Sequence, residues 1–505
     1  MSFCYKSHYM KINDLKILIS FLFLLFYISG LSAQPVSETS DTLKITLQDA
    51  ILLGLDNNPT LNIQRLDPEL TNTIAKEESG AFDPVLGASL QKSTSKSQRR
   101  LGASRTPFDM KDERFDYSAQ ISEALPTGTI LNINAGMTGS ISNLYTDQYS
   151  GTLGFTITQS LLQGLGFGYN LANLRQAKLD VEISKSELKG MAENVIAQIE
   201  TGYWDVYLTE KETAIQKQSL ELAEKQLFES LERVKVGKLP KLEIAAVEAE
   251  VAARRSALID AQSQNEQARL QLIYLLNPQL ENLWSSVPST LDQPFLPEDS
   301  LDTIPVHEKL GMKYRPDLEQ ARFALKKGEL EVSRTKNGLL PKLDFFISMG
   351  RTTYSEFFDK AYPDINSPFY QISGGLTFEF PVPNRQASAR LDRAKFSKEQ
   401  EELAVKNMEK TVQLDVRSSY TEVLRSRQQI EATRVTRELQ DKKLAAEVEK
   451  FRVGKSTNIL VLQAQRDYTT SQLEEARAMV AYLDALLNLY VAEGTLLQRR
   501  GIETF

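Results

Sequence analysis

The chain has 505 residues, 25% of them charged and 41% hydrophobic, and its formal net charge is −7. An acidic chain gives no electrostatic reason to bind nucleic acid, because phosphate backbones attract basic surfaces. Beyond residue 33 it has one histidine, His307, and no cysteine, which excludes sites built from several His or Cys ligands and Cys–His nucleophiles. We therefore expect no nucleic-acid partner, no metal, no cofactor and no catalytic residue.

Residues 1–33 are predicted to be a secretory signal peptide. Three lysines precede an apolar stretch from Ile17 to Ile28, and small residues lead to Ala33, after which we expect cleavage. The only cysteine, Cys4, precedes that stretch, so no cysteine stands at the cleavage point for lipidation. No later apolar stretch approaches the ~20 residues that a membrane helix needs. If the mature protein enters a membrane, it must do so as β-strands.

Residues 34–276 and 306–494 are predicted to be two copies of one unit. Adding 217 to positions between 171 and 275 lands repeatedly on the same residue type, and an offset of 257 relates the earlier parts. The matches include Leu174 with Leu391, Tyr203 with Tyr420, Val236-Gly237-Lys238 with Val453-Gly454-Lys455, and Pro84 with Pro341. The change of offset predicts an insertion in the first copy between roughly 90 and 150.

Each copy is predicted to open with an amphipathic helix, over 46–80 in the first and about 306–338 in the second. Alternating apolar and polar residues then predict strands near 149–158, 343–350 and 370–380. A further hairpin is predicted over 113–138, with its turn at Pro126-Thr127-Gly128. A β-sandwich would also explain the alternation. Segments of about ten residues with aromatic residues near their ends favour a membrane barrel that several chains close together, and whether the 113–138 hairpin joins that barrel stays open.

Two very long helices are predicted over 171–235 and 387–452, which have few helix breakers. At ~1.5 Å per residue each would be ~100 Å long. Apolar residues recur at spacings of three and four, the pattern of coiled-coil packing. Return helices are predicted over 240–276 and 457–492, with a tight turn at each Val-Gly-Lys sequence. Residues 277–305, which contain Trp284, would form a loop-rich belt around the rods, and 495–505 a tail.

The chain resembles the TolC-type outer-membrane efflux proteins, or outer membrane factors, from about Leu43 to Gly494. The motifs that carry the resemblance occur in order along the chain: Leu47-Gln48-Asp49-Ala50, Asn57-Asn58-Pro59, Leu340-Pro341-Lys342-Leu343, Phe380-Pro381-Val382 and the two Val-Gly tips. The resemblance implies a mostly α-helical fold with a β-barrel. It implies a homotrimer whose strands form one twelve-stranded barrel in outer-membrane lipid and whose helices form a periplasmic tunnel.

The resemblance also implies a function and partners. The trimer would be a passive conduit in a tripartite efflux or type I secretion system, receiving substrates from an inner-membrane transporter through a periplasmic adaptor protein. Adaptor contact would fall on the hairpin tips, at Val236, Gly237, Lys238, Val453, Gly454 and Lys455. The family's periplasmic constriction would lie near Glu243, Leu460 and Gln463. Because Leu460 and Gln463 occupy positions where the family carries acids, we expect no acidic ring, and Glu243 is also explained as a solvated helix face.

Two other classes of function fit the sequence less well than a channel. An enzyme would need a constellation of reactive residues, and Gly164-Leu165-Gly166-Phe167-Gly168 lacks the Lys-Ser/Thr of a phosphate-binding loop. A periplasmic coiled-coil scaffold or adaptor would explain the signal peptide and the rods. It would leave the repeated amphipathic strands without a role, so the channel is the favoured interpretation.

Overall fold

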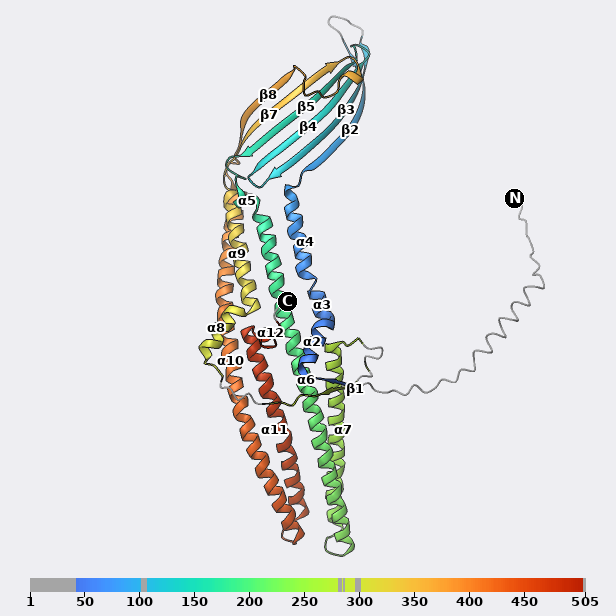
Figure 1. The fold of residues 1–505 in the computed structure, drawn as a ribbon, viewed down its shortest axis with the longest axis vertical. Coiled ribbons are helices and arrows are strands. Elements are labelled where there is room, and N and C mark those ends of the chain that lie inside the picture. Colours follow the sequence, from blue (N-terminus) through green and yellow to red (C-terminus); the bar gives the residue numbers. More distant parts are fainter. Residues whose placement is uncertain (1–41, 101–106, 280–283, 285–286, 296–300, 503–505) are drawn as a thin grey trace, which may run out of the picture.

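The computed structural model describes residues 42–100, 107–279, 284, 287–295 and 301–502, so the predicted signal peptide lies outside the described residues. The molecule is elongated, with one β-sheet at one end and long helices running from it to two hairpin tips at the other (Figure 1). No helix in the described ranges has a stretch that is both long and apolar enough to cross a lipid bilayer.

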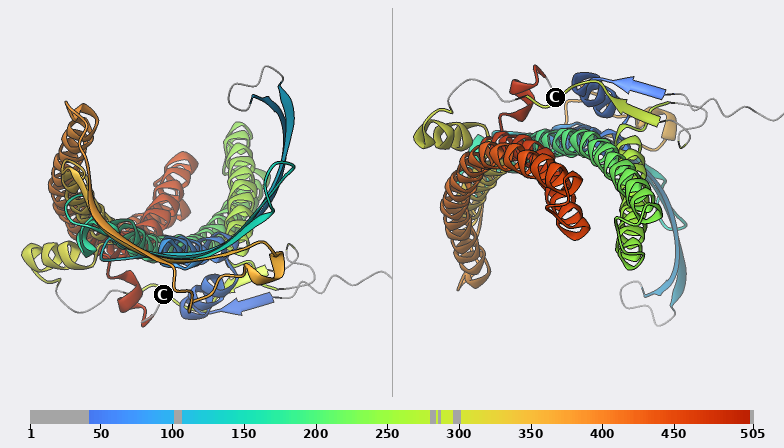
Figure 2. Two further views of the ribbon diagram at one scale, coloured as in Figure 1. Left: turned by 90° about the horizontal axis from the view of Figure 1, so that it is seen from above. Right: turned by 90° about the horizontal axis from the view of Figure 1, so that it is seen from below.

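Four helices form the two hairpins. Helix α6 (Ala172–Lys235) has 64 residues and returns through α7 (Leu242–Leu276), while α10 (Arg385–Arg452) has 68 residues and returns through α11 (Asn458–Glu493). The predicted rods and return helices are thus confirmed to within two residues at each end. Seen along the long axis, these helices form one curved layer with a concave side (Figure 2).

The apolar seams of these helices meet in two cores. In the first, Val195, Ile199 and Tyr203 of α6 pack with Leu272 and Leu276 of α7, and Leu487 of α11 joins them. In the second, Val412, Val416 and Val423 of α10 pack with Tyr482 and Leu489 of α11. Because α11 contributes to both cores, the two copies are packed against each other and not merely joined in sequence.

The opening segments of the copies are not the single helices that the sequence predicted. The first is divided into α2 (Leu47–Asn57), α3 (Pro59–Gln64) and α4 (Asp67–Ser79), and the second into α8 (Ile304–Tyr314) and α9 (Pro316–Asn337). Pro59 and Pro316 lack the backbone N–H that a continuous helix would use, and each disfavours a helical residue before it. Asn58 starts α3 by accepting hydrogen bonds from the N–H groups of Thr60 and Leu61.

Six antiparallel strands form the sheet, in the order β2-β3-β4-β5-β7-β8. Their bounds are β2 Val85–Arg99, β3 Phe108–Leu125, β4 Thr129–Ser142, β5 Gln148–Ser160, β7 Lys342–Ser355 and β8 Tyr370–Glu379. The predicted 113–138 hairpin is formed by β3 and β4, and it lies inside the same sheet as the other strands. A twelve-stranded barrel shared by three chains would take four strands from each, whereas this chain has six in its sheet, because the insertion in the first copy adds β3 and β4.

A belt crosses the rods on their convex side (Figure 2). Strand β1 (Thr42–Ile45) pairs in parallel with β6 (Val287–Thr290), and neither strand was predicted from the sequence. The buried Tyr203 hydroxyl of α6 accepts hydrogen bonds from the N–H groups of Leu291 and Asp292 and bonds to the carbonyl oxygen of Ile45, at 3.1–3.2 Å. The segment after α11 forms helix α12 (Leu496–Arg499), whose two leucines are buried in the first core.

Candidate functional site at the hairpin tips

The two hairpin tips have the same backbone geometry. Gly237 and Gly454 each have a φ of 74°, which an L side chain rarely adopts. The N–H of Lys238 donates to the Arg233 carbonyl at 2.8 Å, and that of Lys455 donates to the Lys450 carbonyl at 2.8 Å. This is the Schellman arrangement that ends a helix. No atom lies within 4 Å of a side chain placed at either glycine, so glycine is required by the backbone and not by crowding.

The remaining predicted tip residues are exposed. Val236 and Val453 keep 66% and 67% of their surface accessible, and Lys238 and Lys455 are also exposed. Exposed valines flanked by lysines form a small apolar surface with a positive rim, and the two copies present it side by side.

The three predicted constriction residues lie just above the tips. Glu243 is half-buried in the first turn of α7, where the helix dipole favours an acid. Leu460 and Gln463 are exposed near the start of α11, whose first turn has no acidic residue. The structure therefore places one acid and two uncharged residues in this part of the chain, on two different helices.

A line of polar residues on α6, which we call the interhairpin seam, was missed by the sequence analysis. It consists of Glu212, Ser219, Gln226 and Arg233, spaced seven residues apart. The first three are at least 93% buried. A spacing of seven keeps side chains on one face of a helix that packs in a coiled coil, and this face is turned toward the second hairpin. Regular polar positions inside an apolar pattern were the available signal.

Each seam residue has a partner on the other hairpin. The Glu212 carboxylate pairs with Arg477 at 2.6 Å, and the Ser219 and Thr469 hydroxyls lie 3.1 Å apart. Closest to the tips, the Gln226 amide donates to the Asn458 side-chain oxygen at 2.6 Å, and Asn458 is only 1% exposed. These contacts hold the two hairpins side by side through directional bonds instead of apolar packing alone.

The last seam contact is at the tips themselves. Arg233 donates to the Phe451 carbonyl oxygen at 3.1 Å, and its guanidinium lies over the Phe451 ring, 4.3 Å from the centroid. Cation–π contacts of this kind are worth ~0.5–2 kcal/mol. The end of α6 is thereby fixed to the end of α10, immediately before the two exposed Val-Gly-Lys turns.

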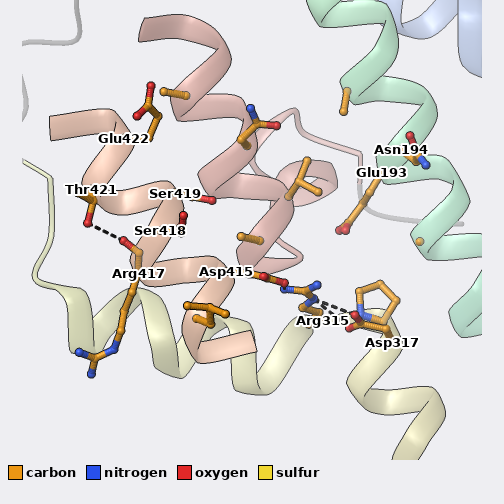
Figure 3. Close-up of a pocket in the computed structure, with 18 of the residues that line it drawn as sticks. Glu193, Asn194, Arg315, Asp317, Asp415, Arg417, Ser418, Ser419, Thr421 and Glu422 are labelled. Atoms are coloured by element: carbon orange, nitrogen blue, oxygen red, sulfur yellow. Dashed lines mark hydrogen bonds and ion pairs between the residues drawn. The ribbon is translucent and has the colours of Figure 1, made fainter. Parts of the chain in front are cut away.

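A second polar region lies where α8 meets α9. An open pocket of about 1090 Å³ is lined by residues of α6, α9, α10 and α11 (Figure 3). Its central side chain, Arg315, binds Asp317 at 3.0 Å and Asp415 at 2.7 Å. Burial raises the pKa of Glu193 to about 7, against the opposing charges of Lys189 and Arg315. Two carboxylates of the second copy, from α9 and α10, therefore share one guanidinium, and the first copy contributes Glu193 of α6 to the lining of the same pocket.

The described residues offer no sign of a metal centre. In those ranges, no group of three or more His, Cys, Asp or Glu side chains is placed to hold a metal ion. His307 is buried in α8, where its Nδ1 bonds to the carboxylate of Glu493 in α11 and its ring lies against Tyr420. His307 thereby links the start of the second copy to the end of α11.

Comparison with known sequences decides the family. The profile of the family described as "Outer membrane efflux protein" matches residues 51–278 and 312–495. The chain belongs to the outer membrane efflux protein family. The two matched segments correspond to the two copies, with the gap between them covering most of the belt. Membership places this efflux protein in the outer membrane as a channel and rules against the periplasmic scaffold, and the family is one of channels and not of enzymes.

The relatives match most of the length of this efflux protein at low identity. The outer membrane efflux protein BepC of Brucella suis is 21% identical over 427 residues, covering 83% of this chain and 88% of BepC. The toluene efflux pump outer membrane protein TtgC of Pseudomonas putida is 22% identical over 404 residues, 75% of this chain and 77% of TtgC. The structure of the Campylobacter jejuni CmeC outer membrane channel has a TM-score of 0.66 at 15% identity, covering 89% of this chain and 85% of CmeC, which shows the fold.

Proposed function

We propose that three copies of this chain form the outer-membrane channel of a tripartite export system, through which an inner-membrane transporter passes its substrates with the help of a periplasmic adaptor. The curved helical layer supports this proposal, because a layer with one concave side closes into a tunnel when copies of it are placed around an axis (Figure 2). The name of TtgC, a pump's outer membrane protein, is consistent with such an assembly.

The adaptor would bind the tips. The observation that carries this assignment is the identical exposed turn at Gly237 and Gly454, which has no packing role within the chain. Three copies would present six such turns in a ring, so an adaptor that recognises one turn could bind all of them, and binding at several sites raises the overall affinity.

Opening of the periplasmic end would separate hairpins along the interhairpin seam. The seam hydrogen bonds would form in the closed state and be replaced by hydrogen bonds to water in the open state. Water can satisfy the side chains of Gln226, Asn458 and Ser219 equally well. The absence of an acidic residue at Leu460 and Gln463 means that these positions would not hold a cation-binding ring, so hydrogen bonds would keep this end closed.

The adaptor role is tested by substituting the tip glycines. We expect Gly237→Val or Gly454→Val to lower export and adaptor co-purification at least several-fold, because a β-branched residue at a φ of 74° distorts the turn. The trimer should remain, since no packed atom is disturbed. Gly501→Val is a matched control, because Gly501 also has a positive φ, 73°, and open space around it but lies after α12, away from the hairpin tips. Normal export and adaptor capture by both tip variants would refute the assignment.

A further inference from the structure

The six-stranded sheet ends in two open edges. Among the described residues, β2 pairs only with β3, and β8 pairs only with β7. An open edge exposes a row of backbone N–H and C=O groups, and each such group left unsatisfied in lipid costs several kcal/mol. A membrane wall made of this sheet must therefore pair both edges with further strands.

In the part of the sheet next to the helices, each of the six strands has a mainly apolar and a mainly polar face, and these faces are in register with each other. One row of directly paired residues crosses the whole sheet and is apolar throughout: Leu86, Ile121, Ile133, Phe155, Met349 and Ile372. The next row contains only glycines and amides: Gly87, Gln120, Asn134, Gly154, Gly350 and Gln371. This alternation is the pattern of a barrel wall between lipid and water. Strands β3 and β4 follow it as closely as the other four.

The apolar face is the convex one. Phe358, in the short helix η3 (Phe358–Lys360) of the loop between β7 and β8, packs edge-on against Tyr117 and Tyr149. Both tyrosines lie an even number of residues from the apolar row in their strands, so they are on the same face of the sheet as that row. The loop lies on the convex side of the sheet (Figure 2). A closed barrel would thus present its apolar side chains outward to lipid.

The β3–β4 hairpin is built into the wall at its helix-side end. The carbonyl groups of its turn accept two hydrogen bonds at the junction that leads into α6: the Gly166 N–H donates to the Thr127 carbonyl at 3.0 Å, and the Ser160 N–H donates to the Gly128 carbonyl at 3.0 Å. Gly128 has a φ of 86°, and a side chain there would meet the Gly164 carbonyl oxygen. Removing the hairpin from the sheet would break these bonds and the pairing of β2 with the rest.

We propose that the partner of both edges is a second copy of this chain, with β2 of one copy paired to β8 of the next, so that three copies close a barrel of eighteen strands. This inference rests on the trimer of the proposed function. Strand β2 runs away from the helices and β8 runs toward them, so the new pair is antiparallel like the others. Aligning their helix-side ends, Val85 and Glu379, places Leu86 opposite Phe378 and Ala88 opposite Leu376. Apolar residues then face apolar residues, whereas a slip of one residue would invert the faces.

A barrel of this size is wider than the tunnel that feeds it. Barrel diameter grows roughly linearly with strand number, so eighteen strands give about one and a half times the width of twelve. Only four of the six strands continue into helices, through the junctions α4–β2, β5–α6, α9–β7 and β8–α10. The helical tunnel gains no helices from the insertion. The barrel would then set no limit on cargo size, which the periplasmic part alone would determine.

Cysteine cross-linking in the membrane tests the strand that closes the barrel. The mature chain contains no cysteine, so Ala88→Cys with Leu376→Cys gives a single defined pair. Ala135→Cys with Leu376→Cys is the matched control, because Ala88, Ala119 and Ala135 belong to one row of paired residues on the apolar face. The control pair would cross-link only if β4, and not β2, paired with β8 of the next copy. In that case β2 and β3 would lie outside a smaller barrel.

With a mild oxidant, we expect the β2–β8 pair to give covalent dimers and trimers on a denaturing gel and the control pair to give none. Two outcomes would overturn the eighteen-stranded barrel but leave the channel proposal intact. One is cross-linking of the control pair, and the other is no cross-linking of either pair in a protein whose native mass is that of a trimer. A wild-type chain that is not trimeric would overturn both proposals. Electron microscopy of the wild type is a check that needs no variant: an end-on diameter matching a twelve-stranded barrel, instead of about one and a half times that width, would refute the inference.

Discussion

Weakening the interhairpin seam should open the periplasmic end, and Asn458 is the residue to change. In the closed arrangement its buried side chain accepts from Gln226 at 2.6 Å and lies 3.2 Å from the Ser230 hydroxyl. Asn458→Ala leaves the Gln226 amide without its partner in a buried place, which costs ~1–3 kcal/mol. The same amide would be hydrated once the hairpins separate, so the cost falls on the closed state. The open-to-closed ratio should rise about 5- to 150-fold for each copy.

Single-channel recording in planar bilayers measures this ratio directly, as conductance and open time. Uptake of a large antibiotic by cells that make the variant gives an independent readout. Ser426→Ala is the matched control, because Ser426 is also 1% exposed but its hydroxyl bonds only to carbonyl groups of its own helix, those of Glu422 and Val423. The gating argument is wrong if Asn458→Ala folds as a trimer with wild-type conductance, or if Ser426→Ala opens the channel equally.

Three further outcomes follow from buried contacts elsewhere. The pKa of Glu193 is about 7 in the folded chain and 4.5 for the free side chain, so the free energy of unfolding should fall as pH rises from 4.5 to 7. Glu193→Gln should remove this fall, which is worth at most about 3 kcal/mol, as thermal melts at pH 5 and pH 8 would show. Tyr203→Phe removes the hydroxyl that binds the belt at Leu291 and Asp292, so it should lower the free energy of unfolding by ~1–3 kcal/mol and speed proteolysis near these two residues, while unchanged cleavage would contradict the belt contact. Gly128→Val should reduce the yield of heat-resistant trimers strongly, whereas Gly168→Val, which has open space and no positive φ, should not.

The helices were predictable because their signal is local and repeated many times. Rods such as α6 carry an uninterrupted apolar period, so their ends were found to within two residues. The breaks at Pro59 and Pro316 were missed because the apolar period continues on both sides of each proline. Periodicity describes which face is buried, but it does not say whether the backbone is continuous.

The features that the sequence did not predict depend on partners far away in the chain. The alternation in 113–138 indicated strands, but membership in the sheet depends on β2 and β5, whose register no local pattern contains. Gln226 resembles any solvated residue on a charged helix until α11 is placed against it. The tip glycines were found because a helix end has a local signature. What the sequence could not supply was the arrangement of one hairpin against the other.

The belt imposes an order on how the protein can be made. Leu47, just after β1, donates to the side chain of Asp292, which lies 245 residues further along the chain. As the chain emerges into the periplasm from its N-terminus, β1 must wait unpaired while the whole first copy passes. Closing so long a loop is slow compared with forming a helix hairpin. During that interval the backbone groups of β1 lack the partner that β6 provides, so this segment is open to pairing with another chain until β6 arrives.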